Sequence, residues 1–106
     1  MKNFDEALKL YMENVARLRN AWMVKFCPNI AESHKYVIER AGGRKYIKVT
    51  MASSGSKSVH SFVNFENGDI YKAAGWNAPA LNAARGNIFF DDGADALSYD
   101  GQVRYL

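Results

Sequence analysis

The sequence has few residues that could build covalent or metal-bound structure. Cys27 is the only cysteine among its 106 residues, so the chain can form neither an intrachain disulfide nor a cysteine-based zinc site. His34 and His60 are the only histidines, and their wide separation does not match a metal-ligand spacing. We therefore expect no metal and no other cofactor.

Long apolar runs are also missing. No uncharged stretch approaches the roughly 20 residues of a membrane-spanning helix, and residues 2–6 lack the apolar segment of a secretion signal. The sequence thus predicts a chain with no membrane partner that works in the cytoplasm. Its length and its 48% hydrophobic content fit a single domain over residues 1–106.

Motifs that carry catalysis are absent from the sequence. It has neither a Walker-type phosphate loop nor a Gly-x-Ser-x-Gly nucleophile elbow. Asp91, Asp92 and Asp95 lack the alternating ligands and the closing glutamate of a calcium loop. His60 lies on the polar side of a predicted strand without a nucleophile nearby, so we expect a surface or interface residue. These absences predict a protein that is not an enzyme.

Charge is distributed unevenly along the chain, whose net charge is +3. Residues 34–90 hold eight basic and three acidic side chains, whereas residues 91–106 hold one basic and four acidic side chains. A basic segment that also carries aromatic side chains and asparagine is typical of proteins that contact phosphates and bases. A solvated surface without a ligand would show the same charge, and both interpretations stay open.

The first quarter of the sequence predicts one long helix over about residues 4–26. Apolar residues recur at steps of three and four, at Phe4, Leu8, Tyr11, Val15, Leu18 and Trp22. Asn3 stands at the N-cap position and Glu6 where a capping box places its acidic residue, while Pro28 ends the pattern. We expect this stripe to pack across a sheet, with a coiled-coil seam as the alternative.

After Pro28 the apolar spacing changes from that of a helix to that of strands. Residues 36–39 and 47–51 alternate around Gly42 and Gly43 and predict a hairpin. Residues 52–58 are rich in serine and predict a flexible turn, and residues 59–65 predict a third strand. The Asn67-Gly68 pair predicts a type I′ turn, after which residues 69–74 return antiparallel.

The rest of the chain has weaker patterns. Residues 75–84 predict a loop with a short helical turn over 78–84, residues 87–90 a further strand, and residues 103–106 one more short strand. The expected fold is mainly β with an N-terminal helix: a five-stranded, strongly bent antiparallel sheet or small barrel over about residues 34–90, followed by an acidic segment, 91–106. Open sheet edges favour pairing between copies in a closed ring.

Several short pieces together resemble a known family. They are Val59–Asn64, Asn67–Lys72, Trp76–Pro79 and Ala84–Ile88, and the combination is similar to small Sm-like proteins of cyanophages, other marine phages and ocean metagenomes. The resemblance covers about residues 44–89. It implies an Sm/LSm (SH3-like) five-stranded bent barrel, a homo-oligomeric ring of about five to seven subunits, and binding of RNA or single-stranded DNA during phage nucleic-acid processing in the infected bacterial host.

One piece of this resemblance is more specific. Arg85, Gly86 and Asn87 look like the Arg-Gly part of the second Sm motif, where the arginine and its neighbours line the RNA-binding pore. The first Sm motif has no counterpart, because Asp69 and Asn77 are wrongly spaced for it. The uridine preference of that motif is therefore not carried over.

The predicted nucleic-acid-binding residues combine this resemblance with residue chemistry. Trp76 follows a glycine in a loop, where it could stack on a base or instead plug the barrel or a subunit interface. Arg85 could contact a phosphate or a guanine edge, or instead pair with Asp91 or Asp92. Tyr71 and Lys72 point to opposite faces of one strand, and we select Lys72. The full set is Lys48, Lys72, Trp76, Asn77, Arg85, Gly86 and Asn87.

A different class of function fits the same fold. A small ring-forming barrel can serve as a protein-interaction or virion-assembly module without contacting nucleic acid. Salt-dependent binding to oligonucleotides separates the two functions, because phosphate contacts release counterions.

Overall fold

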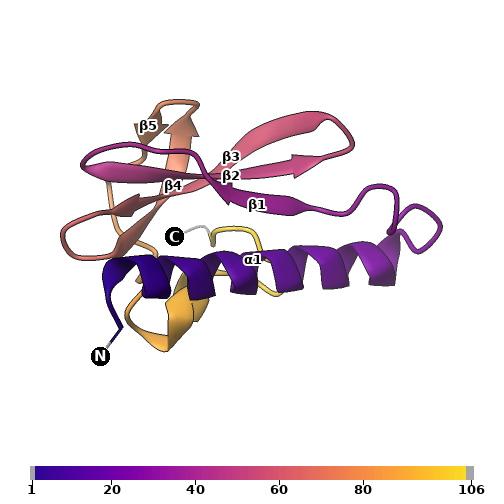
Figure 1. Cartoon of the computed structure of the whole chain (residues 1–106), viewed down its shortest axis with the longest axis horizontal. Helices are drawn as coiled ribbons and strands as arrows, with labels where there is room; N and C mark the ends of the chain where they lie inside the picture. Colours follow the sequence, from indigo (N-terminus) through magenta and orange to yellow (C-terminus); the bar gives the residue numbers. More distant parts are fainter. Residues whose placement is uncertain (1, 105–106) are drawn as a thin grey trace.

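A computed structural model describes residues 2–104 and places one helix beneath one sheet (Figure 1). Helix α1 spans Phe4–Phe26, as predicted. The side-chain oxygen of Asn3 accepts a hydrogen bond from the backbone N–H of Glu6 at 2.9 Å, which satisfies one of the free donors of the first turn. The helix ends at Cys27, because Pro28 has no N–H with which to continue it.

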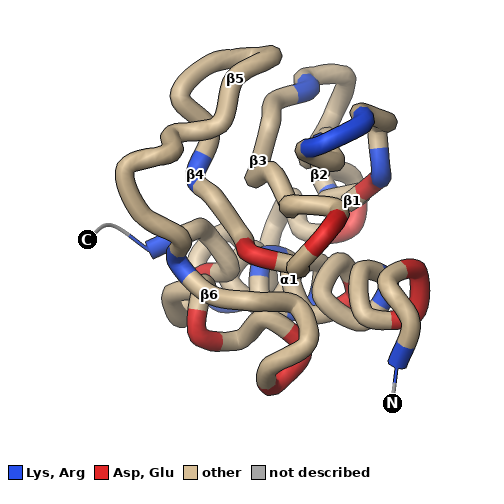
Figure 2. The backbone as a smooth tube through the Cα atoms, turned by 90° about the vertical axis from the view of Figure 1, so that its left-hand side faces the viewer, with Lys and Arg blue, Asp and Glu red and all other residues tan. Residues whose placement is uncertain are grey.

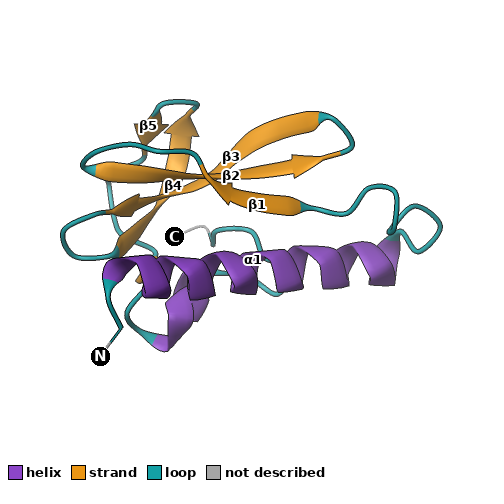
Figure 3. Cartoon of the chain, viewed as in Figure 1, coloured by secondary structure: helices purple, strands orange, loops and turns teal. Residues whose placement is uncertain are grey.

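Within the described residues six strands follow, and all of their pairings are antiparallel (Figure 3). They are β1 (Val37–Arg40), β2 (Tyr46–Ser53), β3 (Ser56–Asn64), β4 (Asp69–Gly75), β5 (Ala78–Pro79) and β6 (Gly86–Asn87). The order in the sheet is β1-β2-β3-β4-β5, and β6 also pairs with β4. The predicted mainly β fold with an N-terminal helix is confirmed. The described strands leave the sheet open, with β1 at one edge and the short β5 and β6 at the other.

The turn between β2 and β3 differs from the prediction. Both strands continue through most of the segment 52–58, which we expected to be flexible, and only Ser54 and Gly55 separate them. The φ angles of these two residues are +51° and +85°, which is the pattern of a two-residue type I′ turn. The serine-rich composition of this segment indicated flexibility, but the segment forms a tight hairpin.

The predicted type I′ turn at Asn67-Gly68 is wrong, although β3 and β4 do pair as expected. Gly68 has a φ of +80°, but Asn67 is not among the residues with positive φ. Instead the side-chain oxygen of Asn64 accepts hydrogen bonds from the backbone N–H groups of Glu66 and Asn67. This capping stabilises a longer turn, closed by a 2.8 Å bond from the N–H of Gly68 to the Asn64 carbonyl.

The chain after β4 contains less strand and more helix than predicted. Residues 78–84 hold no helical turn, since Ala78 and Pro79 form β5. The strand expected over 87–90 is reduced to β6, because the chain turns at residues 88–90 into a 3₁₀ helix, η1 (Asp91–Ala96). Val103 forms an isolated bridge with Leu97. Residues 105–106 of the strand predicted at 103–106 lie outside the described residues.

The hydrophobic core lies between α1 and the inner face of the sheet. Its buried side chains come from the helix, from β2 to β4 and from the segment around η1, and include Leu8, Tyr11, Val15, Ile47, Val49, Val63, Ile70 and Ile88. The predicted stripe of α1 therefore packs on the sheet and not on a second helix. None of the helices within residues 2–104 combines the length and apolar character that crossing a membrane requires.

Candidate nucleic-acid interface

The outer face of the sheet, which points away from α1, carries Lys48. Its neighbours on β2, Ile47 and Val49, are buried in the core, and side chains alternate along a strand. The strand register places Lys48 opposite Phe62 of β3 and Phe62 opposite Tyr71 of β4. Lys48 and these two aromatic side chains therefore form one row across three strands.

The β4–β5 turn brings two further predicted residues to this row. The Nζ of Lys48 donates a 2.6 Å hydrogen bond to Oδ1 of Asn77 and lies 4.5 Å from the ring centre of Trp76. Lys48, Trp76 and Asn77 were all predicted as binding residues, and the structure brings them together. Half of the Trp76 side chain, 51%, is exposed, so this residue does not plug the interior of the subunit.

We call the surface formed by Tyr46, Lys48, Tyr71, Trp76 and Asn77 the Trp76 face. A hollow of about 310 Å³ opens in it, lined by Ala41, Gly42, Gly43, Tyr46, Lys48, Phe62 and Asn77. Gly43 has a φ of +117°, and a Cβ there would lie 2.1 Å from the Tyr46 carbonyl oxygen. Glycine is therefore required for the chain to turn this closely beside the hollow.

The aromatic members of the Trp76 face support one another. The rings of Tyr46 and Tyr71 meet edge to face with their centres 5.8 Å apart, a favourable geometry for aromatic pairs. Partial desolvation, followed by the nearby Asp69 and Tyr46, raises the pKa of Tyr71. At neutral pH its phenol group is protonated, as that of any tyrosine is, and can donate a hydrogen bond.

Basic side chains border the Trp76 face. Lys45 lies with its Nζ 5.6 Å from the Tyr46 ring centre, and Arg44 beside it is exposed. Lys57 lines a second hollow, of about 340 Å³, together with Trp76. Figure 2 shows Lys and Arg segments in the loops on the strand side and a group of Asp and Glu segments around η1, with Glu39 of β1 and Asp69 of β4 on the strand side as well. The acidic residues of the C-terminal segment are thus grouped around η1.

Arg85 lies elsewhere. It leads into β6, which pairs with Asp69 and Ile70 at the start of β4, whereas Trp76 follows the end of β4. At ~3.3 Å per residue the two places are about 17 Å apart. The Arg85 guanidinium donates to the backbone carbonyls of Arg104 and Ala83 at 3.1 and 2.6 Å. Among residues 2–104 it forms no ion pair with either aspartate considered for it.

Gly86 and Asn87 have structural partners at the same corner. A Cβ on Gly86 would lie 2.8 Å from the backbone nitrogen of Ala96, so its glycine allows η1 to pack on β6. The Asn87 amide nitrogen donates to the Asn67 carbonyl and to the Asp69 carboxylate at 2.7 and 2.9 Å. The three residues that resemble the second Sm motif therefore hold a turn together and do not share a surface with Trp76.

Lys72 lies on the inner face of the sheet, opposite Ser61. It lines a cavity of about 400 Å³ with His60, Asp100 and Gln102, among others. The structure therefore places Tyr71, and not the selected Lys72, on the Trp76 face.

His60 was expected at the surface or at an interface, and this expectation is wrong, because only 5% of it is exposed within a single copy. The pairing of β2 with β3 shifts between Val49 and Thr50, so that His60 is an extra residue in β3. Such a β-bulge turns a side chain away from the simple alternation of the strand. His60 and Ser61 consequently both face α1.

A buried chain of hydrogen bonds runs through this bulge. His60 donates from Nε2–H to the Gly101 carbonyl at 2.7 Å, and its Nδ1 accepts from the Ser61 hydroxyl at 2.9 Å. The Tyr11 hydroxyl then donates to Ser61 Oγ at 2.7 Å. Burial lowers the pKa of His60 to about 4 and raises the pKa of Tyr11. The chain joins α1, β3 and the C-terminal turn.

Arg19 is a second buried polar residue that sequence reasoning missed. Its guanidinium donates to the Tyr36 hydroxyl at 2.6 Å and to the Asp100 carbonyl at 3.2 Å, and lies 4.3 Å from the Tyr36 ring centre. Its position was a usable signal, because Arg19 follows Val15 by four residues and therefore lies on the apolar stripe of α1.

Within residues 2–104, no three His, Cys, Asp or Glu side chains lie close enough together to hold a metal ion. No curated protein and no solved structure matches the chain. One family model does match, over residues 3–106, and its description is a family of unknown function. The chain therefore belongs to the DUF7717 family.

Proposed function

We propose that this protein binds single-stranded nucleic acid, either RNA or single-stranded DNA, through the Trp76 face. The observation that carries the proposal is the contact among three predicted residues. The Lys48 ammonium group is held by Asn77 at 2.6 Å and lies 4.5 Å from the half-exposed ring of Trp76. A cation beside an exposed aromatic ring matches the phosphate and base of one nucleotide.

The aromatic ring and the cations would contribute to the binding free energy through different interactions. Stacking of a base on an aromatic ring contributes about 1–3 kcal/mol and tolerates any base. The cations Arg44, Lys45, Lys48 and Lys57 would neutralise phosphates along the strand and release counterions. Because the Asn77 bond already orders the Lys48 side chain, that lysine loses less conformational entropy when it binds a phosphate.

The proposal includes assembly into a ring of about five to seven copies with Sm-like curvature. Its support is the open sheet, which leaves the outer edge of β1 and the short β5 and β6 edge without a further strand. Contacts between copies, at these edges or elsewhere on the surface, give a ring if the rotation between copies closes. Phage nucleic-acid processing in the host cytoplasm, by binding and without catalysis, is the role that the resemblance implies.

Replacing Trp76 tests stacking. Trp76→Ala should weaken binding to a fluorescent single-stranded oligonucleotide by about 5- to 150-fold, the equivalent of about 1–3 kcal/mol. The slope of affinity against salt should stay nearly constant, because no charge is lost. Anisotropy titrations at several salt concentrations measure both quantities. The matched control is Tyr99→Ala, an exposed aromatic residue that lines the cavity on the inner side of the sheet. Equal affinity of Trp76→Ala and wild type would argue against the site.

Two further variants, one at Lys48 and one at Arg85, test which of the two charges contributes to binding. Lys48→Gln should weaken binding to all sequences and reduce the salt slope by roughly one unit. Arg85→Gln should leave the slope unchanged, because the Arg85 guanidinium is already bonded to two backbone carbonyls. The same titrations measure both variants. The opposite result, a reduced slope for Arg85→Gln alone, would place the binding site at the corner that resembles the second Sm motif.

The alternative is a protein-interaction or virion-assembly ring that has no nucleic-acid role. Phe89 and Phe90, both exposed and next to each other in sequence, favour it, since exposed aromatic side chains are common at protein interfaces. Assembly of the purified chain, combined with no binding to single strands even at low salt, would select this alternative.

A further inference from the structure

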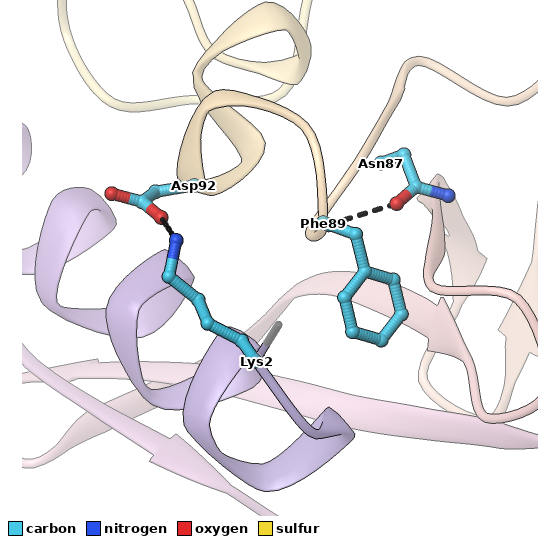
Figure 4. Close-up of polar contacts among 4 residues, drawn as sticks. All are labelled: Lys2, Asn87, Phe89 and Asp92. Atoms are coloured by element: carbon cyan, nitrogen blue, oxygen red, sulfur yellow. Dashed lines mark hydrogen bonds and ion pairs between the residues drawn. The ribbon is translucent and has the colours of Figure 1, made fainter.

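The turn between β6 and η1 carries two partly exposed aromatic side chains, of which Phe89 lies with its ring edge against Gly68. Phe89 is 44% exposed and Phe90 61%. The backbone N–H of Phe89 donates a 2.8 Å hydrogen bond to Oδ1 of Asn87, as Figure 4 shows. Asp91 and Asp92 both have positive φ, +52° and +53°, which is uncommon outside glycine. The two rings are thus displayed by a tightly specified turn.

Three aspartates follow these rings in the sequence. Asp91 and Asp95 are exposed, and Asp92 makes a 2.8 Å ion pair with Lys2, which ties the turn to the start of α1 (Figure 4). Among residues 2–104 neither Asp91 nor Asp95 has an ion-pair partner. We call Phe89, Phe90, Asp91 and Asp95 the acidic tip.

The acidic tip and the Trp76 face lie at different ends of the molecule. The tip follows β6, which pairs with the start of β4, whereas Trp76 follows the end of β4. In Figure 1 the segment around η1 lies below the N-terminal part of α1, and β5 lies at the far side of the sheet. A single rigid copy therefore cannot bring its own tip onto its own Trp76 face.

We infer that the acidic tip of one copy docks on the Trp76 face of a second copy. The two surfaces are complementary in charge, because the tip carries uncompensated carboxylates and the face is bordered by Arg44, Lys45 and Lys57. Both present exposed aromatic rings, the residue type most enriched at protein interfaces. Opposite potentials favour this pairing over contacts between two tips or between two faces.

This contact joins two different surfaces and is therefore heterologous, or head to tail. Each docked copy still presents a free tip and a free face, so the contact repeats until the rotation closes a ring. The inference rests on the proposed function in one respect, namely that the Trp76 face is the binding surface. A docked tip would cover that face, so self-association and strand binding should compete.

Two variants test the inference because each removes one surface. The tip variant carries Phe90→Ser and Asp91→Asn, and asparagine tolerates the positive φ at position 91. The face variant carries Trp76→Ser and Lys48→Gln. All four changed side chains lie at least partly at the surface, and circular dichroism melting curves check that both variants fold. The double variant Lys25→Gln and Tyr99→Ser changes a basic and an aromatic exposed residue elsewhere and is the matched control.

Sedimentation velocity over a concentration series at low salt gives the answer. We expect the wild type and the control to sediment as species larger than the 11.9 kDa monomer, and each test variant alone to sediment as a monomer. An equimolar mixture of the two variants should form a heterodimer and nothing larger, because it retains one intact tip and one intact face. A monomeric wild type, a monomeric mixture, or assembly of either variant alone would overturn the inference.

Titration of the same proteins with a single-stranded oligonucleotide separates this inference from the proposed function. The tip variant keeps its Trp76 face and should bind severalfold more tightly than wild type at concentrations where wild type assembles. Strand binding by a wild type that stays monomeric would overturn only the inference. Head-to-tail assembly without strand binding would overturn only the proposed function.

Discussion

Lowering the pH from 7 to 5 should reduce the free energy of unfolding by about 2 kcal/mol through His60 alone. The pKa of His60 is lowered to about 4 in the folded protein, against ~6.5 for an unfolded histidine. Between about pH 4 and pH 6.5 the histidine binds a proton in the unfolded chain but not in the folded protein. The contribution of His60 to the free energy of unfolding is therefore fully present above about pH 6.5 and falls as the pH drops towards 4. Below about pH 4 this group causes no further change.

The cause is both burial and the direction of the hydrogen bonds. Burial is the largest contribution to the lowered pKa, and the nearby Arg19 lowers it further, while the bond to Gly101 and the charge of Asp100 raise it. A proton on Nδ1 would also face the Ser61 hydroxyl, which now donates to that atom at 2.9 Å. Ser61 would have to accept at that atom, and its own hydroxyl hydrogen would lose its present acceptor.

Chemical denaturation at pH 7, 6 and 5 measures this effect. His60→Gln should be less stable than wild type at pH 7, because glutamine fits the buried site poorly, but should lose little further stability by pH 5. His34→Gln is the control, since the His34 ring bonds only to Ser33 and Ile30 of its own loop and its replacement leaves the His60 site unchanged. A wild-type stability that does not change between pH 7 and 5 would contradict the buried neutral histidine.

Gly93→Ala should reduce the free energy of unfolding by roughly 2–5 kcal/mol, by two separate effects. Gly93 has a φ of +78°, and a Cβ there would lie 2.4 Å from Cδ1 of Tyr11 and 3.0 Å from Cδ1 of Ile70. Both neighbours are fully buried, so the extra methyl group has no space. The left-handed backbone contributes ~1–2 kcal/mol of this loss and overpacking ~1–3 kcal/mol.

Gly55→Ala separates these two effects. Gly55 has a similar φ of +85°, but nothing lies within 4 Å of a Cβ at that position. This variant should therefore lose only the backbone contribution, and the difference between the two variants measures packing against Tyr11. Urea denaturation of both variants gives the values. Equal losses would mean that η1 shifts freely and does not pack firmly on the core.

Local features of the chain were readable from the sequence alone. The helix was predicted with its correct ends, because the spacing of its apolar stripe, the Asn3 cap and the Pro28 stop all act within a few residues. The β1–β2 hairpin and the antiparallel return of β4 were predicted for the same reason. A repeat of two residues, or of three to four residues, shows only which side chains share a face of one strand or one helix.

Features that depend on pairing between strands were not readable in this way. The bulge at His60 exists because β3 has one residue more than β2 between two consecutive strand pairs. It buries a histidine that the alternation of a single strand places at the surface. The two-residue turn at Ser54-Gly55 likewise follows from the register that joins β2 to β3. Neither residue type nor spacing along one strand carries that information.

The candidate site shows the same difference between what the sequence predicts locally and what the strand pairing decides. Residue chemistry and the Sm-like resemblance together selected Lys48, Trp76 and Asn77, because cations and exposed aromatic rings suit phosphates and bases. The sheet decided which of the selected residues belong together. It brings Lys48 within 2.6 Å of Asn77 across 29 residues of sequence, and it places Arg85 at the other end of β4 and Lys72 on the opposite face. Long-range contacts are set by strand order and register, which one sequence does not encode locally.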